Sequence, residues 1–391
     1  MPIPLKYNWR NLFVRRVSTA MTLLGVALVV TVFLLVMSLA EGVRKTFQSV
    51  VSERDVVVLR VGAQSDVQSI ITRDEYESIR TLAGIERDAE GNPLVSPELV
   101  VLINIARRDG KKTNVIVRGV EPVALKFRPA LRLVEGRLFR DGTSECIVSR
   151  RSQQRFANME LGREIRAGSE RWTVVGVFES SNSPYDSEVW ADLHDVQAQA
   201  ERGTGFSGVR VRAVDPAARD RLIAAVKGDQ RIKLEAKTEK QFFYDQMGTA
   251  KPIQFLAYFV AVIMAIGASF GAMNTMYAQV SARIREVATM RALGFSRRAI
   301  LASFVVESVV LALLGGVLGS AIAVGVVRTA LTAPTGTQNF STFAEILFNF
   351  RITPPLVLSG MVFALAMGLF GGFFPAVRAA RLKISQALRG A

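Results

Sequence analysis

Few side chains of this chain could perform catalysis, and those few stand alone. His194 is the only histidine and Cys146 the only cysteine. Most His-based metal and catalytic sites, and any internal disulfide, therefore lack the residues that they need. We expect His194 to lie at the surface and Cys146 to be a small buried residue. There is also no G-x-x-x-x-G-K-[ST] loop, whose backbone N–H groups would bind nucleotide phosphates. The sequence thus predicts no catalytic residue, no metal site and no cofactor held by this chain.

One stretch has the pattern of a catalytic nucleophile but the wrong surroundings. Gly267-Ala-Ser-Phe-Gly271 matches G-x-S-x-G, a motif that needs a turn between a strand and a helix, whereas here it lies inside a long apolar run. The same residues read as G-x-x-x-G, a spacing that lets transmembrane helices approach closely. The glycines with this spacing are Gly267 and Gly271, Gly315 and Gly319, and Gly368 and Gly372. They are predicted to pack helices, either within one bundle or between two copies of the chain.

The composition indicates a membrane part combined with a water-soluble part. The chain has 391 residues, of which 50% are hydrophobic and 21% charged, and a formal net charge of +15. A pI near 10.4 would by itself favour a nucleic-acid-binding protein. The mean hydropathy of +0.26, however, is high for a soluble protein and low for a chain that lies entirely in a membrane. The position of the positive charges therefore decides the interpretation.

Four apolar runs are long enough to cross a membrane. Residues 17–40, 252–280 and 352–377 contain no charged side chain, and residues 299–327 contain only Glu307. A helix needs roughly 20 residues to cross the hydrocarbon core. The first run could instead be a signal peptide ending at Ser38-Leu39-Ala40, but it is longer than the usual apolar core of about 7–15 residues. We therefore predict four transmembrane helices, of which the first is an uncleaved anchor.

The basic residues gather in three short segments. Residues 1–16, 281–298 and 378–391 each carry a net charge of +4, whereas the long segment 41–251 carries only +3. Loops rich in Lys and Arg stay in the cytoplasm, so 41–251 and the loop 328–351 should lie on the other side of the membrane. The predicted fold class is a membrane protein of the cytoplasmic (inner) membrane with four transmembrane helices, both termini inside, and a large extracytoplasmic α/β domain between helices 1 and 2. The positive charge is then a topology signal, and no nucleic-acid partner is predicted.

The segment 41–251 is typical of a soluble α/β domain. Apolar, β-branched runs predict strands at 55–61, 99–105, 114–118, 145–149, 172–178 and 208–212. Helices are predicted at 73–82 after Thr72, at 153–159, and at 217–227 after Asp215. We expect two small lobes divided near 120–133, and helical ends at 41–52 and 238–251 that form a stalk.

The loop 281–298 contains a short amphipathic helix. Helical periodicity places four apolar residues on one side, namely Ile284, Val287, Met290 and Leu293. Gly294 is predicted to end this helix and Ser296 to cap the next one. The charge of the loop fits an interfacial helix on anionic lipid and equally a docking element for a cytoplasmic partner.

The segment 273–308, MNTMYAQVSARIREVATMRALGFSRRAILASFVVES, resembles the signature of the MacB/FtsX-type ABC transporter permeases. The tail from Pro375 to Arg389 is similar to the closing sequence of that family, except that Ile384 stands where a proline is common. In the outer segment, Gly136-Arg-Leu-Phe, Leu161-Gly162 and the strand at 172–178 follow the order of the family's motifs. The resemblance covers nearly the whole chain.

The resemblance implies a permease that works with a separate cytoplasmic ATPase, which would hold the ATP and Mg. The loop 281–298 would then be the coupling helix that docks on this ATPase. The residues implied in this contact are Arg283, Arg285, Glu286, Met290, Arg291, Leu293 and Gly294. Further implied partners are a second permease copy, identical or related, a periplasmic adaptor protein, and membrane lipid.

Glu307 is the single charged residue of the third apolar run. An ionisable group inside a membrane is costly and usually functional. It could lie close to the cytoplasmic boundary and pair with Arg297 or Arg298. Because the resemblance includes a Glu at this position, we favour a structural or coupling role over substrate binding.

Two functions fit the resemblance. In the first, ATP hydrolysis moves the outer domain by mechanotransmission, for export or extraction of a lipoprotein, peptide or small molecule. In the second, an FtsX-like complex activates an extracytoplasmic cell-wall hydrolase, although members of that kind typically have a smaller outer domain. A third class, a membrane-anchored enzyme, lacks a convergent set of catalytic side chains. In neither of the first two functions is the chain itself an enzyme.

Overall fold

The computed structural model describes residues 16–48, 52–167, 170–181, 183–200, 203–246, 250–331, 335–338 and 342–382. The chain divides into two compact units. The helical unit comprises Met1–Glu41, Pro252–Thr332 and Phe350–Ala391, and the α/β domain comprises Gly42–Lys251 and Ala333–Asn349. Most of the predicted cytoplasmic N-terminal segment, residues 1–15, lies outside the described residues, as does the tail from Lys383.

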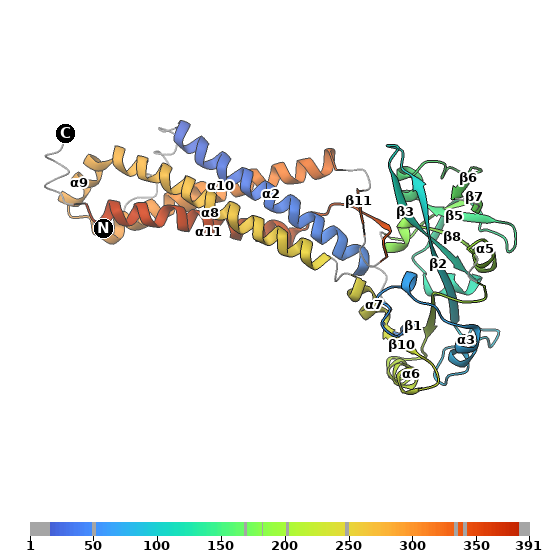
Figure 1. Ribbon diagram of the computed structural model, residues 1–391. Coiled ribbons are helices and arrows are strands. Elements are labelled where there is room, and N and C mark those ends of the chain that lie inside the picture. Colours follow the sequence, from blue (N-terminus) through green and yellow to red (C-terminus); the bar gives the residue numbers. More distant parts are fainter. Residues whose placement is uncertain are drawn as a thin grey trace. The chain divides into compact units, whose positions relative to one another are not determined.

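The helical unit contains four long helices that lie side by side (Figure 1). They are α2 (Arg16–Gln48), α8 (Ala250–Ala282), α10 (Arg297–Thr329) and α11 (Pro354–Ala380). Each contains a stretch that is long and apolar enough to cross a membrane: Thr19–Gly42, Tyr258–Ala282, Arg297–Thr329 and Pro354–Ala380. The four predicted transmembrane helices are thus present, and the short helix α9 (Ile284–Ala292) lies between the second and the third at one end of the bundle.

Close helix contacts explain four of the predicted packing glycines. A Cβ atom at Gly319 would lie 2.5 Å from the carbonyl oxygen of Ala27 on α2, and one at Gly368 would lie 2.6 Å from the Cβ of Ala312 on α10. Gly315 and Gly372 are equally crowded. Thr31 on α2 adds a hydrogen bond, because its hydroxyl donates to the Gly319 carbonyl at 3.0 Å. These glycines therefore pack helices within one bundle.

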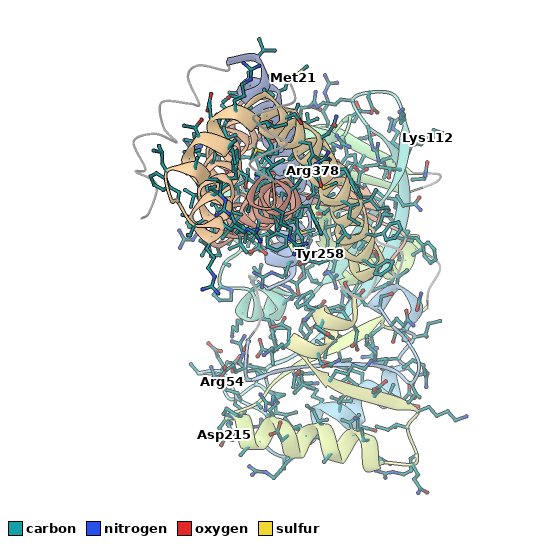
Figure 2. All side chains as sticks on the ribbon, turned by 90° about the vertical axis from the view of Figure 1, so that its left-hand side faces the viewer. Met21, Arg54, Lys112, Asp215, Tyr258 and Arg378 are labelled. Carbon is teal, nitrogen blue, oxygen red and sulfur yellow. The ribbon has the colours of Figure 1, made fainter. Side chains whose placement is uncertain are left out.

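Gly267 and Gly271, the other predicted pair, differ from these four. A Cβ atom at either position would meet nothing within 4 Å. Both lie on α8, the least covered of the four helices, whose most apolar window is only 11% buried. The outer surface of the bundle is apolar elsewhere too: Met21 on α2, for example, projects outward (Figure 2) and is 67% exposed.

The α/β domain is built on one ten-stranded sheet with the order β10-β1-β9-β2-β3-β8-β5-β7-β4, and β6 pairs with β7. The strands are β1 (Asp55–Arg60), β2 (Val95–Ala106), β3 (Lys112–Val120), β4 (Arg132–Gly136), β5 (Glu145–Ser149), β6 (Glu164–Ala167), β7 (Glu170–Glu179), β8 (Glu188–Asp192), β9 (Gly208–Arg212) and β10 (Leu234–Thr238). The α-helices are α3 (Arg73–Arg80), α4 (Arg150–Arg155), α5 (Leu193–Gln199), α6 (Pro216–Gly228) and α7 (Glu239–Gln246), and the 3₁₀ helices are η1 (Asp66–Gln68), η2 (Pro122–Phe127) and η3 (Pro184–Ser187).

The sheet is continuous where two lobes were expected. The joint is the parallel pairing of β3 with β8, which places Val117 opposite Val189, and β8 continues antiparallel onto β5. No strand was predicted at 188–192, because the segment is short and its partners are remote in the sequence. Val117 and Val189 are both fully buried, so the core runs through the joint.

Capping residues fix the helix starts that the sequence predicts. The Thr72 hydroxyl accepts from the backbone N–H of Glu75 and the Glu75 carboxylate accepts from the N–H of Thr72, which completes a capping box at the start of α3. Asp215 accepts from the N–H of Ala218 at the start of α6 (Figure 2). Both helices were predicted to within two residues at each end.

The loop between α10 and α11 contains a β-hairpin that the sequence did not predict. Strands β11 (Thr335–Gln338) and β12 (Glu345–Phe348) pair antiparallel. This hairpin belongs to the α/β domain, because Ile346 and Leu347 are buried in its core. Residues 333–349 therefore belong to the α/β domain, although they are remote in the sequence from its other residues, 42–251.

Candidate coupling site

The inner face of α9 packs against the ends of the long helices. Val287 and Ala288 are buried, and Val287 joins an apolar cluster with Met276 of α8, Phe304 of α10 and Ala376 of α11. Met290 packs against the same cluster and is partly buried. Amphipathic periodicity therefore predicted the buried side of this helix correctly for Val287 and Met290, and Ile284 is partly buried. The prediction was wrong for Leu293, which lies past the end of the helix and is 73% exposed.

Both ends of the turn after α9 are fixed by backbone geometry. The N–H of Phe295 donates to the carbonyl of Met290, and the N–H of Gly294 donates to that of Arg291, at 3.1 Å each, which is a Schellman motif. Gly294 has φ +92°, a conformation that disfavours any side chain. The Ser296 hydroxyl then accepts from the N–H of Ala299 and starts α10. The predicted stop at Gly294 and cap at Ser296 are confirmed.

Arg283 and Glu307 form a buried, bidentate ion pair. The two guanidinium nitrogens of Arg283 donate to the two carboxylate oxygens of Glu307 at 2.9 and 3.1 Å. Arg283 is 5% exposed and Glu307 3%. The guanidinium also lies 5.9 Å from the ring centre of Phe304. Arg297 and Arg298, the partners considered for Glu307 from the sequence, are exposed. The pair ties the corner between α8 and α9 to the interior of α10.

The outer face of this segment is polar with one large apolar side chain. Arg285, Glu286 and Gly294 are exposed, and Leu293 is 73% exposed. Arg291 is partly buried and donates to the Phe295 carbonyl at 3.1 Å. Of the seven residues predicted to contact a partner, four are thus at the surface, two are partly buried, and Arg283 points inward. We call Arg285, Glu286, Leu293 and Gly294 the outer face of α9.

The domain contains a buried charge network that sequence reasoning missed. Arg118 donates to Glu188 at 2.7 Å and to Glu98 at 2.8 Å, and Glu98 also accepts from Arg128 at 2.6 Å. All four residues are at most 3% exposed. Burial would raise the pKa of Glu98, but the nearby guanidinium groups of Arg128, Arg210 and Arg118 outweigh it and lower that pKa to about 2.

A sequence signal for this network exists only in part. Glu98, Arg118 and Glu188 lie within strands whose neighbours are apolar, so an isolated charge in a buried strand was the available clue. The pairing itself depends on the sheet order. Because each charge has a partner, the network can stay buried without leaving a charge uncompensated.

The two isolated residues lie as expected. The His194 side chain is 75% exposed. Cys146 is fully buried, and burial raises the pKa of its thiol. In the part of the chain that the structure describes, no group of His, Cys, Asp or Glu side chains has the geometry of a metal site.

Four membrane-length helices, an α/β domain inserted after the first, and a short surface helix before the third define a multi-pass membrane protein of the permease type. Two family models match the chain: the MacB-like periplasmic core domain over residues 19–228 and the FtsX-like permease C-terminal region over residues 258–384. The chain therefore belongs to the MacB/FtsX family of ABC transporter permeases. It is a multi-pass protein of the inner membrane, with its α/β domain outside the cytoplasm.

The chain spans less than two thirds of the length of the curated relatives described here. The macrolide export ATP-binding/permease protein MacB of Escherichia coli is 26% identical over 386 residues, which cover 94% of this chain and 57% of that protein. The pyoverdine export ATP-binding/permease protein PvdT of Pseudomonas entomophila is 24% identical over 410 residues, which cover 98% and 59%. Among solved structures, the periplasmic region of MacB from Actinobacillus actinomycetemcomitans is similar with a TM-score of 0.38 and 14% identity, covering 49% of this chain and 92% of that chain.

Proposed function

We propose that this chain transmits the work of a separate cytoplasmic ATPase to its extracytoplasmic domain. Nucleotide binding and hydrolysis on the ATPase would displace α9, and the long helices would carry this displacement to the α/β domain. ATP and Mg would be held by the ATPase, so the chain itself would be a non-catalytic subunit. The moved domain would act in the export or extraction of a lipoprotein, peptide or small molecule.

The observation that carries this proposal is the way α9 is held. Its inner face is packed against three long helices, and its first corner is tied to α10 by the Arg283–Glu307 pair. A force on the outer face therefore reaches α8, α10 and α11 together rather than bending a loose loop. Arg283 has a positioning role in this proposal, and contact with the ATPase belongs to the outer face.

The substrate class is supported only by similarity. The relatives quoted above are named for macrolide and pyoverdine export, which supports an export role without specifying a cargo. The match of residues 19–228 to a MacB-like periplasmic core domain does not favour the FtsX-like regulatory function. A periplasmic adaptor is a further partner that this proposal includes, and lipid surrounds the apolar helices.

The experiment is reconstitution of the full chain with a cytoplasmic ABC ATPase that co-purifies with it. Leu293→Glu places a charge in the apolar part of the outer face, and Arg285→Glu reverses a charge on the same face. We expect each to abolish the stimulation of ATP hydrolysis, since hot-spot side chains at an interface contribute about 2 kcal/mol or more, or at least about 30-fold in affinity. Stimulated phosphate release is the measurement.

Arg328→Glu is the matched control, because Arg328 is an exposed arginine in the last turn of α10, far along the helix from α9. It should leave stimulation intact. Glu286→Ala is a third variant of the outer face, and it removes a charge instead of reversing one. Intact assembly and hydrolysis in both Leu293→Glu and Arg285→Glu would refute the docking role of α9.

A further inference from the structure

Two connections join the α/β domain to the helical unit. One is the insertion between α2 and α8, and the other is the β11–β12 hairpin between α10 and α11. Within the domain, each connection is held by a buried carboxylate: Glu239, which is 3% exposed, and Glu345, which is 2% exposed. A carboxylate is costly to bury unless it is paired, so each of the two residues marks a point where the connecting chain is bonded to the body of the domain.

Glu239 is the first residue of α7, the helix that precedes α8. Its Oε1 accepts from Arg210 of β9 at 2.9 Å, and its Oε2 accepts from the backbone N–H of Ser52 at 2.8 Å. Ser52 is the first described residue after α2. The Glu239 side chain thus links the segment that enters the domain after α2, the segment that leaves it before α8, and strand β9 of the sheet.

Glu345 is the first residue of β12 and fixes the hairpin in the same manner. Its Oε2 accepts from Arg107 at 2.7 Å, and its Oε1 accepts from Arg155 at 3.0 Å. Arg107 follows β2 and Arg155 ends α4, so the carboxylate is held by two separate parts of the domain. The backbone N–H of Leu347 also donates to the Ser187 hydroxyl at 2.8 Å.

Apolar burial fixes the hairpin further. Leu347 is fully buried in the main core of the domain, Ile346 is 7% exposed, and Ala344 is 1% exposed. Ile346 packs in a second cluster that includes Trp190 and Phe242. The hairpin is therefore a permanent component of the domain and not a loop that rests on its surface.

The link from the hairpin to α11 is short. The backbone N–H of Arg351 donates to the carbonyl of Ser38 on α2 at 3.4 Å, so Arg351 already belongs to the helical unit. Only Asn349 and Phe350 separate Phe348 from Arg351. The three Cα–Cα steps between them span at most about 10 Å. A displacement of α11 beyond this slack must either move the hairpin or break its contacts.

We propose that the β11–β12 hairpin is a second mechanical connection, which carries movement of α10 and α11 into the domain, and that Glu345 is the positioning residue that holds it. This inference rests on the proposed function. Without the hairpin, the domain follows α2 and α8 alone and is free to rotate about that single attachment. With it, the domain follows all four long helices.

The test uses the full chain in lipid nanodiscs, without the ATPase. Glu345→Gln keeps the size of the side chain but removes its charge. We expect amide hydrogen exchange at 344–348 to accelerate about tenfold, because hydrogen bonds to a charged group are lost, while the amides of β3 keep their protection. Glu135→Gln is the matched control, since Glu135 pairs with Arg150 at 2.9 Å but is 47% exposed.

A distance measurement then tests the mechanical role. Spin labels at Asp220→Cys on α6, where the side chain is 66% exposed, and at Leu358→Cys on α11, 65% exposed, report on the two units. Cys146 is buried, so we expect it not to take up label. In Glu345→Gln, the distance distribution should broaden relative to the wild type and to Glu135→Gln. A second variant, with six Gly/Ser residues inserted after Asn349, should broaden it with Glu345 still in place.

Each outcome decides the inference. Unchanged exchange at 344–348 in Glu345→Gln would refute the holding role of that carboxylate. Loss of protection in β3 as well would make Glu345 a general stabiliser of the domain and would overturn its specific role. A distribution that stays narrow in the insertion variant would refute the mechanical connection. Because no measurement here involves the ATPase, these failures are separate from a failure of the α9 experiment.

Discussion

At the scale of a single residue, Arg283 shows how the corner between the two helices α8 and α9 is fixed. The sequence places it among several arginines at the start of an amphipathic helix, and family resemblance assigns it to a partner. In the structure its backbone leaves the helical conformation, with φ −111° and ψ 17° at the corner between α8 and α9. That corner turns the side chain toward Glu307, a carboxylate in the interior of α10.

The pair gives a testable consequence for stability. Arg283→Met leaves Glu307 buried without a partner, and we expect this to lower the free energy of unfolding by about 3–5 kcal/mol. Replacing both residues, as Arg283→Met with Glu307→Met, removes the uncompensated charge and should recover most of that loss. Thermal or chemical unfolding of the full chain in detergent measures this. Equal losses in the single and double variants would contradict a pair whose partners depend on each other.

The surroundings of some residues could be predicted from the sequence and those of others could not, for a physical reason. Cys146 and His194 were assigned correctly because their surroundings are local: an apolar strand for the first and a polar helix start for the second. The partners of Glu98 and Glu345 were not predicted. Each pairs with arginines that the sheet brings together, such as Arg128 and Arg107, and nothing in a linear sequence records sheet order.

At the scale of elements, the starts of α3 and α6 and the end of α9 were predictable, and the joints between strands were not. The helix predicted at 153–159 was wrong in its bounds, since α4 spans Arg150–Arg155, and α5 was not predicted. Thr72, Asp215 and Gly294 act on backbone groups within five residues, so their effect can be read from the sequence. The β11–β12 hairpin and the pairing of β3 with β8 depend on remote partners. The unpredicted strands β8, β11 and β12 are short, with four or five residues each, and lack a strong alternating pattern of their own.

The open glycines of α8 lead to a prediction about assembly. We propose that Gly267 and Gly271 face a second copy of the permease, because the other predicted glycine pairs are already used within the bundle. Gly271→Leu should lower the yield of cross-linked dimer in membranes about tenfold or more, since a close backbone approach would be lost. Dimer yield from an introduced cysteine on α8 is the measurement.

Two other glycines supply the comparison. Gly325→Leu, on α10, adds the same side chain at another open position and should leave the dimer intact. Gly319→Leu should instead destabilise the monomer, because its Cβ would lie 2.5 Å from the Ala27 carbonyl oxygen. Equal dimer yields for Gly271→Leu and Gly325→Leu would place the interface elsewhere.

At the scale of the whole molecule, the alternation of spans and charges determines which side α9 occupies. The α/β domain lies outside the cytoplasm, and α8 is long enough to cross the membrane after it. We therefore predict that the next segment, with α9 and its arginines, lies inside. The same alternation predicts that both termini lie in the cytoplasm. Keeping basic segments on that side is the common rule for inner-membrane proteins, since their translocation is costly.

This orientation can be measured with a thiol reagent that does not cross membranes. Because Cys146 is buried, we expect no background labelling of the wild-type chain. A cysteine at Lys112, which is exposed on the domain (Figure 2), should be labelled in intact spheroplasts. A cysteine at Arg285, on the outer face of α9, should be labelled only after the membrane is opened. Ser296→Cys would not serve as the inside probe, since Ser296 caps α10 and its loss would disturb the helix that it starts. Labelling of the Arg285 position in intact spheroplasts would contradict the orientation and, with it, the contact of α9 with a cytoplasmic ATPase.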